Sequence, residues 1–340
     1  MKYMNESIDM PPYKDYSAYV SKIITMGIPS SMIYKNWGDD ESTELQTMFN
    51  FFQGYLESGM SFSSSNTYFF YSTDPGIGGA ALTMHGNNFI KINIDTHEKL
   101  NEIFSETEKL FEKEDFERLR FIDKYSNTPL KVLMKSICIN FTYYHELAHC
   151  IQDSEMLLTG MAEEHDSKKY SFEKHVLEYD ADIFSALSIC TSVFQYFENY
   201  YERKTKEILE ELIAILLSAI LVRIFMSPNI KLEFYLKKES HPHWIIRMVK
   251  IIEIMINHIQ NIVNVKYPGV VLNRTLIAQK SNIYSKLLGK ELVPNFNNTE
   301  IEQILYKEVK LINQYSNELL NSCTQLPNSA YMKWNARASG

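Results

Sequence analysis

The chain has 340 residues, of which 45% are hydrophobic, and a formal net charge of -8. This length and apolar content predict a folded globular protein with a substantial core. The charge is spread along the sequence without a basic stripe, so we expect no nucleic-acid partner. The four cysteines are widely spaced in apolar segments, which is typical of a cytoplasmic protein and not of a disulfide framework.

The first part of the chain predicts a small sheet. A helix is expected at 42–57, followed by an aromatic strand at 67–72. Residues 80–84 and 89–94 flank the turn sequence 86–88, which predicts a β-hairpin. We expect the second strand, 89–94, to lie at the edge of the sheet beside the active cleft, where it could hold a substrate by strand addition.

The rest of the chain is predicted to be helical. The N-terminus lacks the pattern of a secretory signal. The apolar stretch 212–225 is shorter than the roughly 20 residues that a bilayer requires, so we expect a buried core helix and no membrane span. Apolar residues at helical spacing predict helices at about 96–120, 130–152, 172–200, 205–226, 243–264, 272–287 and 298–321.

A His-Glu-x-x-His sequence lies within the helix predicted after Pro129. His145 and His149 are four residues apart, so one helix face presents both imidazoles to one metal ion. Glu146 lies beside them, where a carboxylate can take a proton from a water that the metal activates. The spacing therefore predicts a catalytic Zn2+ site with Glu146 as the general base.

Catalytic zinc usually has three protein ligands, so a further residue is required. Glu178, on the next predicted helix, reaches the metal if the two helices run antiparallel. Asp182 follows one turn later on the same face, where it could accept the free ring N–H of a liganding histidine. His165 and His175 are alternative third ligands, but His165 lies in a polar loop and His175 lies among charged residues. We favour Glu178.

A third sequence, Ser240-His241-Pro242, precedes another predicted helix, in which Arg247 follows. A turn followed by a helix in this way can direct two hydrogen-bond donors, His241 and Arg247, at a cleft. Peptide hydrolysis needs donors of this kind, because its tetrahedral intermediate carries negative charge on the former carbonyl oxygen. Taken by itself, a histidine before a proline is also typical of an ordinary turn.

Together, the sequences at 144–152, 178–186 and 240–247 resemble the gluzincin metallopeptidases, in particular the family of the CAAX prenyl protease and the heat-shock membrane protease. Those relatives carry transmembrane helices, so this chain is more similar to soluble phage-exclusion peptidases. By analogy this implies an intracellular protein substrate and a role in host–phage conflict. The resemblance implies His145, His149 and Glu178 as zinc ligands, Glu146 as catalytic base, Asp182 behind the ligands, and His241 with Arg247 around the substrate oxygen.

We therefore predict an α+β, mainly helical zincin of the gluzincin type, with a small N-terminal sheet and a helical C-terminal half. Residues 1–128 form an α/β part with the edge strand, and residues 129–340 carry the zinc helix, the third-ligand helix and the C-terminal helices in one continuous catalytic unit. The predicted function is a zinc metalloendopeptidase. The alternative is a metal-binding sensor or interaction protein without proteolysis, which the presence of Glu146 disfavours. The oligomeric state is not indicated.

Overall fold

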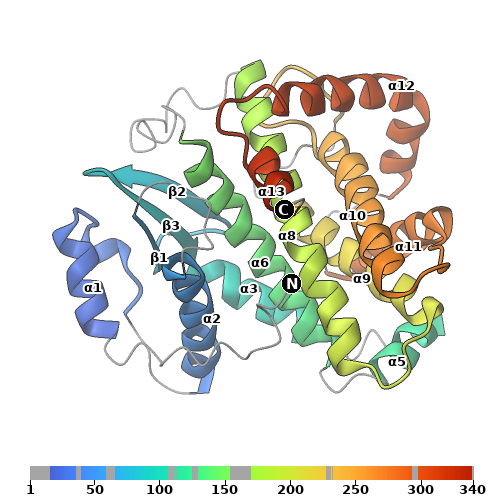
Figure 1. Ribbon diagram of the computed structural model, residues 1–340, viewed down its shortest axis with the longest axis horizontal. Coiled ribbons are helices and arrows are strands. Elements are labelled where there is room, and N and C mark those ends of the chain that lie inside the picture. The colour runs from blue at the N-terminus through green and yellow to red at the C-terminus, as the bar shows by residue number, and fades with distance from the viewer. Residues whose placement is uncertain are drawn as a thin grey trace.

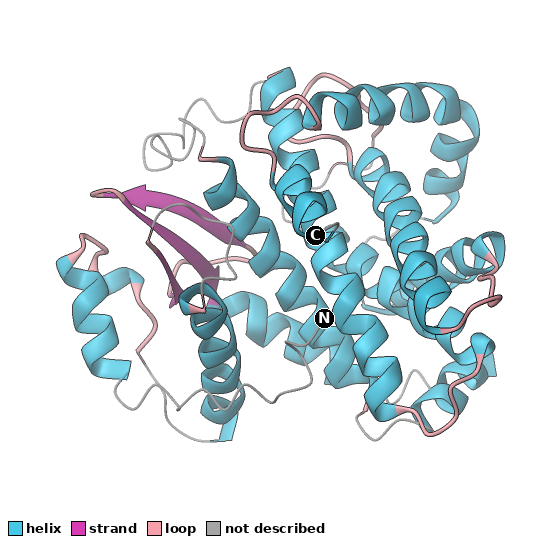
Figure 2. Ribbon diagram, viewed as in Figure 1, coloured by secondary structure: helices cyan, strands magenta, loops and turns pink. Residues whose placement is uncertain are grey.

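The computed structural model describes residues 16–35, 40–58, 66–105, 112, 114–124, 129–153, 170–226, 231, 233–292 and 298–338. In this part of the chain the fold is mainly helical with a small three-stranded sheet, which confirms the predicted α+β class (Figures 1 and 2). The elements are α1 (Tyr16–Thr25), the 3-10 helix η1 (Ser30–Met32), α2 (Asp40–Glu57), β1 (Thr67–Ser72), β2 (Gly79–Met84), β3 (Asn87–Asn93), α3 (Ile94–Ser105), the 3-10 helix η2 (Glu114–Phe116), α5 (Glu117–Lys124), α6 (Leu130–Gln152), α8 (Phe172–Tyr200), α9 (Lys206–Phe225), α10 (Trp244–Lys266), α11 (Arg274–Leu292), α12 (Asn298–Cys323) and α13 (Ala330–Ala338).

The predicted hairpin is confirmed, because β2 pairs with β3 in an antiparallel arrangement. His85 and Gly86 connect the two strands with positive φ angles of 49° and 75°. A two-residue turn of this kind matches the right-handed twist of the flanking strands. The aromatic strand β1 pairs with β3 in parallel.

The predicted edge position of residues 89–94 is wrong. The strand order is β1-β3-β2, so β3 lies in the middle of the sheet and β2 lies at an edge. Phe89, Ile90 and Ile92 are all fully buried, as expected for a central strand covered on both faces. A hairpin sequence identifies one neighbour of a strand, whereas the parallel neighbour β1 is set by the packing of the whole chain.

The helix predicted at 96–120 is also corrected. In the structure α3 ends at Ser105, and α5 begins at Glu117 directly after the 3-10 turn η2. Leu100 and Ile103 are buried as predicted, whereas Leu110 and Phe111 fall outside the described residues. The other predicted helices are observed, and α1 and α13 are additional to them.

The sheet and the helices share one hydrophobic core. Helix α6 lies between the sheet and α8 (Figure 1). Phe52 of α2 and Tyr143 of α6 stack with ring centroids 4.1 Å apart, and the Tyr143 hydroxyl donates to the Phe52 carbonyl. Buried residues of the N-terminal and helical parts belong to the same cluster, so the sheet is fixed against the helix that carries the His-Glu-x-x-His sequence.

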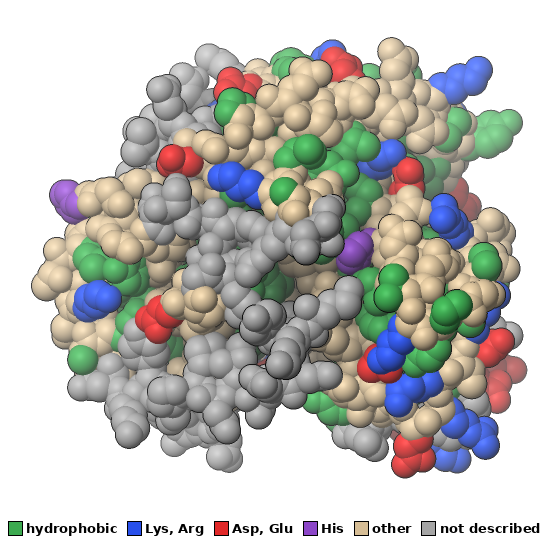
Figure 3. Space-filling model, in the orientation of Figure 1, with side chains coloured by type: hydrophobic (Ala, Val, Ile, Leu, Met, Phe, Trp, Pro, Cys, Tyr) green, Lys and Arg blue, Asp and Glu red, His purple; other side chains and the backbone are tan. Residues whose placement is uncertain are grey.

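Helix α9 is buried along nearly its whole length, which confirms the core helix predicted at 212–225. A helix that is apolar on all sides belongs inside a large core. No helix in the described ranges has both the length and the apolar content that a membrane crossing requires. On the face drawn in Figure 3, Lys and Arg side chains are interspersed with Asp and Glu side chains.

Candidate metal centre

Helix α6 presents two histidines side by side. It begins after Pro129 and ends at Asp153, whose φ of 46° places it in the left-handed conformation that commonly ends a helix. His145 and His149 lie one turn apart, and their Nε2 atoms are 3.2 Å from each other. The other faces of α6 are buried in the core, so the helix holds both rings in fixed positions.

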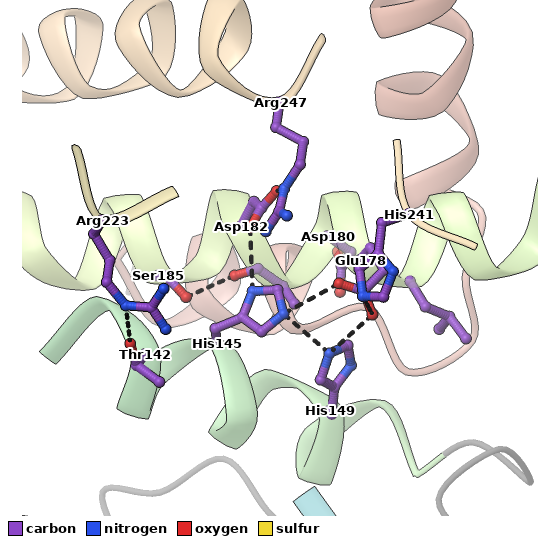
Figure 4. A network of polar contacts seen from close by, with 12 residues as sticks. Thr142, His145, His149, Glu178, Asp180, Asp182, Ser185, Arg223, His241 and Arg247 are labelled. Atoms are coloured by element: carbon purple, nitrogen blue, oxygen red, sulfur yellow. Dashed lines mark hydrogen bonds and ion pairs between the residues drawn. The ribbon is translucent and has the colours of Figure 1, made fainter. Parts of the chain in front are cut away.

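Helix α8 brings a carboxylate to this pair. Its N-terminus is capped by Ser171, whose side chain accepts from the Lys174 backbone N–H. Glu178 Oε2 lies 3.2 Å from His145 Nε2, and Glu178 Oε1 lies 3.6 Å from His149 Nε2. The predicted third ligand is therefore at the site (Figure 4).

The donor set fits a zinc ion. One ligand atom from each of His145, His149 and Glu178 lies within 4.8 Å of the other two. Tetrahedral zinc with bonds of about 2.0–2.1 Å separates its ligand atoms by about 3.3–3.4 Å, close to the separations seen here. Two imidazoles and one carboxylate form a set typical of catalytic zinc, with one position left for water or substrate.

Asp182 supports His145 from behind. It is fully buried, and its Oδ1 lies 3.1 Å from His145 Nδ1, as the one-turn spacing from Glu178 predicted. Arg247 of α10 donates from Nε to Asp182 Oδ2 over 2.6 Å and from Nη2 to Asp182 Oδ1 over 2.7 Å. An acceptor on Nδ1 leaves Nε2 as the nitrogen of His145 that could bind a metal ion.

This geometry gives Arg247 a partner that the sequence did not predict. The resemblance placed its guanidinium around the substrate oxygen, but the fork of donors is bound to Asp182. A bidentate contact with a buried carboxylate is strong and directional, so Arg247 stabilises Asp182 and positions His145 through it.

The site favours positive charge between its carboxylates. Burial alone would lower the pKa of His145, but hydrogen bonds with Asp182 and Glu178 outweigh burial and raise that pKa to about 10. Burial would raise the pKa of Glu178, but the neighbouring His241 and the hydrogen bond with His145 hold it well below its ordinary value. The two carboxylates on either side of His145 therefore favour a positive charge at this position, which a bound cation could supply.

The third sequence also reaches the cluster. His241 Nε2 lies 3.3 Å from Glu178 Oε1, and the His241 side chain is 55% exposed, so it is accessible from outside. The segment that carries it is held by His175, whose ring nitrogens contact the Glu239 carbonyl at 2.8 Å and the Tyr315 hydroxyl at 2.9 Å. His175 is fully buried in these contacts and is therefore not a metal ligand. The other alternative, His165, lies outside the described residues.

Glu146 lies on the side of α6 that faces the sheet. It is 8% exposed, and its Cγ is only 3.1 Å from the position that a Cβ of Gly79 would occupy. Within the described residues its carboxylate has no hydrogen bond or ion pair to the protein. A carboxylate that is positioned but unpaired remains available to accept a proton.

Two residues that were not predicted hold the second histidine. Gln152 accepts from His149 Nδ1 at 2.9 Å, and its Nε2 donates to Asp180 Oδ2 at 2.9 Å. Asp180 also accepts from the Ser329 hydroxyl and the Ala330 backbone N–H, at the start of α13. The spacing of Gln152 three residues after His149 on one helix face was the available signal, whereas the link to Ser329 had none.

No family model, no curated protein and no solved structure matches this chain. The likeness to gluzincin peptidases therefore rests on the three short sequences and on the geometry described above.

Proposed function

We propose that the protein is a zinc-dependent endopeptidase with a zincin-like fold of the gluzincin type. The observation that carries the proposal is the carboxylate of Glu146, which has no hydrogen bond or ion pair among the described residues, beside three residues that could hold a metal ion, His145, His149 and Glu178. A purely structural metal site needs no base next to its ligands, and structural zinc sites usually have four protein ligands. This favours an enzyme over the alternative, a metal-binding sensor or interaction protein.

In the proposed mechanism the chain contributes a base and a donor. Bound zinc would supply Lewis acidity, which lowers the pKa of water and polarises a carbonyl group. Glu146 takes a proton from the attacking water and passes it to the leaving amine. His241, exposed beside Glu178, donates to the carbonyl oxygen as negative charge develops there.

The remaining residues keep the ligands in place. Arg247 and Asp182 orient His145, and Asp180 and Gln152 orient His149. Contacts of this kind fix the tautomer of a liganding histidine and increase its basicity.

The proposed binding surface for the peptide is the outer edge of β2, in place of the residues 89–94 expected from the sequence. Strand β2 pairs with β3 alone among the described strands, and a Cβ at its first residue, Gly79, would lie 3.1 Å from Glu146 Cγ. An extended peptide that adds to this edge would have its backbone held beside the base. The proposed substrate is an intracellular protein, and a role in host–phage conflict is an analogy. The four cysteines are buried and free, which suits a reducing cytoplasm.

The test compares the protein with its Glu146→Gln variant. Both should contain about one zinc per chain by metal analysis, because glutamine preserves the shape of the side chain and Glu146 is not a ligand. New protein N-termini should appear in cells that express the intact protein and be absent with the variant, because an amide cannot accept the proton. Glu173→Gln, on the exposed face of α8, is the matched control. Equal cleavage by Glu146→Gln, or no metal in either protein, contradicts the proposal.

A further inference from the structure

Arg223 is a charged residue in an otherwise apolar stretch. It is the single charged residue in the sequence 212–225 of the core helix α9. Its side chain is half-buried and extends to α6, where Nε donates to the Thr142 hydroxyl over 3.2 Å. Figure 4 shows this pair at one end of the site, with His145 next and His149 beyond it.

The guanidinium of Arg223 forms no ion pair in the described part of the chain, and the carboxylate that attracts it electrostatically is that of the nearby Glu146. Arg247, the other arginine at the site, is paired with Asp182, whereas Arg223 contacts the neutral Thr142. Its two Nη groups have no protein acceptor among the described residues. Burial lowers the pKa of Arg223, but an arginine remains protonated in proteins. A half-buried cation that has no hydrogen-bonded carboxylate among the described residues is unfavourable for folding, so an anionic ligand is a suitable partner for its Nη donors.

The position of Thr142 places these donors next to the base and the edge strand. Thr142 precedes Glu146 by one helical turn on α6. A Cβ at Gly79 would lie 3.2 Å from Thr142 Cγ2 and 3.1 Å from Glu146 Cγ, so the backbone at the start of β2 fits against both side chains. The start of β2, the base and Thr142, which is the hydrogen-bond partner of Arg223, therefore lie next to one another.

We propose that Arg223 is a substrate-binding residue whose free Nη groups hold a carboxylate of the peptide. The inference rests on the proposed function and adds a specificity to it. A planar guanidinium with two free donors binds a carboxylate through two parallel hydrogen bonds, and the unpaired charge favours an anion over a neutral carbonyl. The carboxylate is either the peptide C-terminus or an Asp or Glu side chain near the bond that is cleaved.

The first experiment measures binding without cleavage. Full-length, zinc-loaded Glu146→Gln protein is immobilised and exposed to a synthetic peptide library, in which each sequence occurs with Asp and Glu or with Asn and Gln, and with a free or an amidated C-terminus. Peptides with a carboxylate are expected to be retained about 10- to 100-fold better than their amides. If retention falls when Asp and Glu are replaced by Asn and Gln, the bound carboxylate is a side chain. If retention falls when the C-terminus is amidated, the bound carboxylate is the peptide C-terminus.

Arg223→Gln in the same background is expected to abolish this preference while zinc content is unchanged. Arg223→Lys keeps the charge without the fork and should keep part of the preference, which provides a second variant if glutamine disturbs folding. Arg203→Gln, at an exposed arginine between α8 and α9, is the matched control and should retain the full preference. An equal preference in Arg223→Gln, or none in the parent protein, overturns the proposal.

Two further readouts separate the possible failures. The melting temperature of Arg223→Gln should be unchanged or higher, because the variant removes a half-buried charge that has no ion pair among the described residues. If the arginine had a structural role, its removal would lower the melting temperature. The same library is then incubated with protein that has Glu146 intact. Carboxylate-selective capture without any cleavage contradicts the proposed peptidase activity and supports Arg223 as an anion-binding residue. Cleavage without carboxylate selectivity supports the peptidase activity and contradicts the proposed role of Arg223.

Discussion

At the scale of single residues, Asp182 connects the metal cluster to the C-terminal helices. It is fully buried between His145 of α6 and Arg247 of α10. Burial would raise its pKa, but Arg247 and the hydrogen bond with His145 lower it, so the carboxylate stays ionised. One side chain therefore fixes both a ligand histidine and the start of α10.

The first prediction concerns Arg247→Gln. The substitution leaves the Asp182 carboxylate buried without its cation, and breaking a buried ion pair in this way costs about 3–5 kcal/mol. Urea unfolding should show a loss of this size, together with weaker zinc retention through a misoriented His145. The control Arg203→Gln should change stability by less than about 0.5 kcal/mol. A stable Arg247→Gln protein with reduced turnover alone would restore the role of a substrate contact.

The second prediction concerns His241→Phe. His241 is exposed beside Glu178 and belongs to the proposed oxyanion contacts. Removing one such donor typically lowers turnover about 100- to 1000-fold, with little effect on metal content or ground-state binding. Steady-state kinetics measures the turnover on a substrate that the detection of new N-termini has identified. Metal analysis measures the zinc content of the variant. Loss of zinc instead of turnover would show that His241 acts on the metal ligands.

At the scale of elements, the short helix α13 is linked by hydrogen bonds to the candidate metal site. Its first backbone N–H groups and Ser329 donate to Asp180, which accepts from Gln152, the partner of His149. Burial raises the pKa of Asp180, while these donors act in the opposite direction. The end of the described chain thus helps to orient a ligand about 180 residues earlier.

The third prediction is that truncation after Leu326, which removes α13, weakens zinc binding. Loss of outer contacts to a liganding histidine typically costs about 10- to 100-fold in affinity. Competition with a chelator of known affinity measures the change. Ser329→Ala retains the helix and should have a smaller effect, because the backbone donor of Ala330 remains. Unchanged affinity in the truncated protein would separate α13 from the site.

At the scale of the whole molecule, the metal site lies in the core that joins the sheet and the helices, so site chemistry and global stability are linked. His145 has a folded pKa of about 10, above the ordinary value of about 6.5 in an unfolded chain. A raised pKa contributes stability that is fully present below about pH 6.5 and is lost as the pH rises towards 10.

The fourth prediction is therefore that zinc-free protein loses stability between about pH 6.5 and 10, as measured by urea unfolding. His145→Ala lacks this titration, so its stability should change less over the same range. Zinc should remove the trend, because a liganding imidazole gives up the proton that the metal replaces. If the zinc-free protein and His145→Ala show the same pH dependence, the ion pairs of His145 do not contribute to stability.

The sequence alone determined those features that depend on neighbours in the chain. Helical spacing placed His145 and His149 on one face, and the one-turn separation of Glu178 and Asp182 placed both acids on one face of the next helix. The turn sequence 86–88 predicted the hairpin, although its turn consists of His85 and Gly86 and residues 87 and 88 belong to β3. In each case one helix or one turn sets the geometry, so the periodicity of local backbone structure was sufficient.

Only the tertiary structure decided which distant groups meet. The position of β3 between two strands depends on a parallel neighbour, and the partner of Arg247 depends on how α10 crosses α8. The links of Asp180 to α13 and of Arg223 to Thr142 join segments 149 and 81 residues apart. Such contacts arise from packing angles between helices and from the burial of charge, which no local spacing encodes. The sequence thus identified the candidate ligands and the candidate base, while packing selected the residues that orient them and left Arg223 without an ion pair among the described residues.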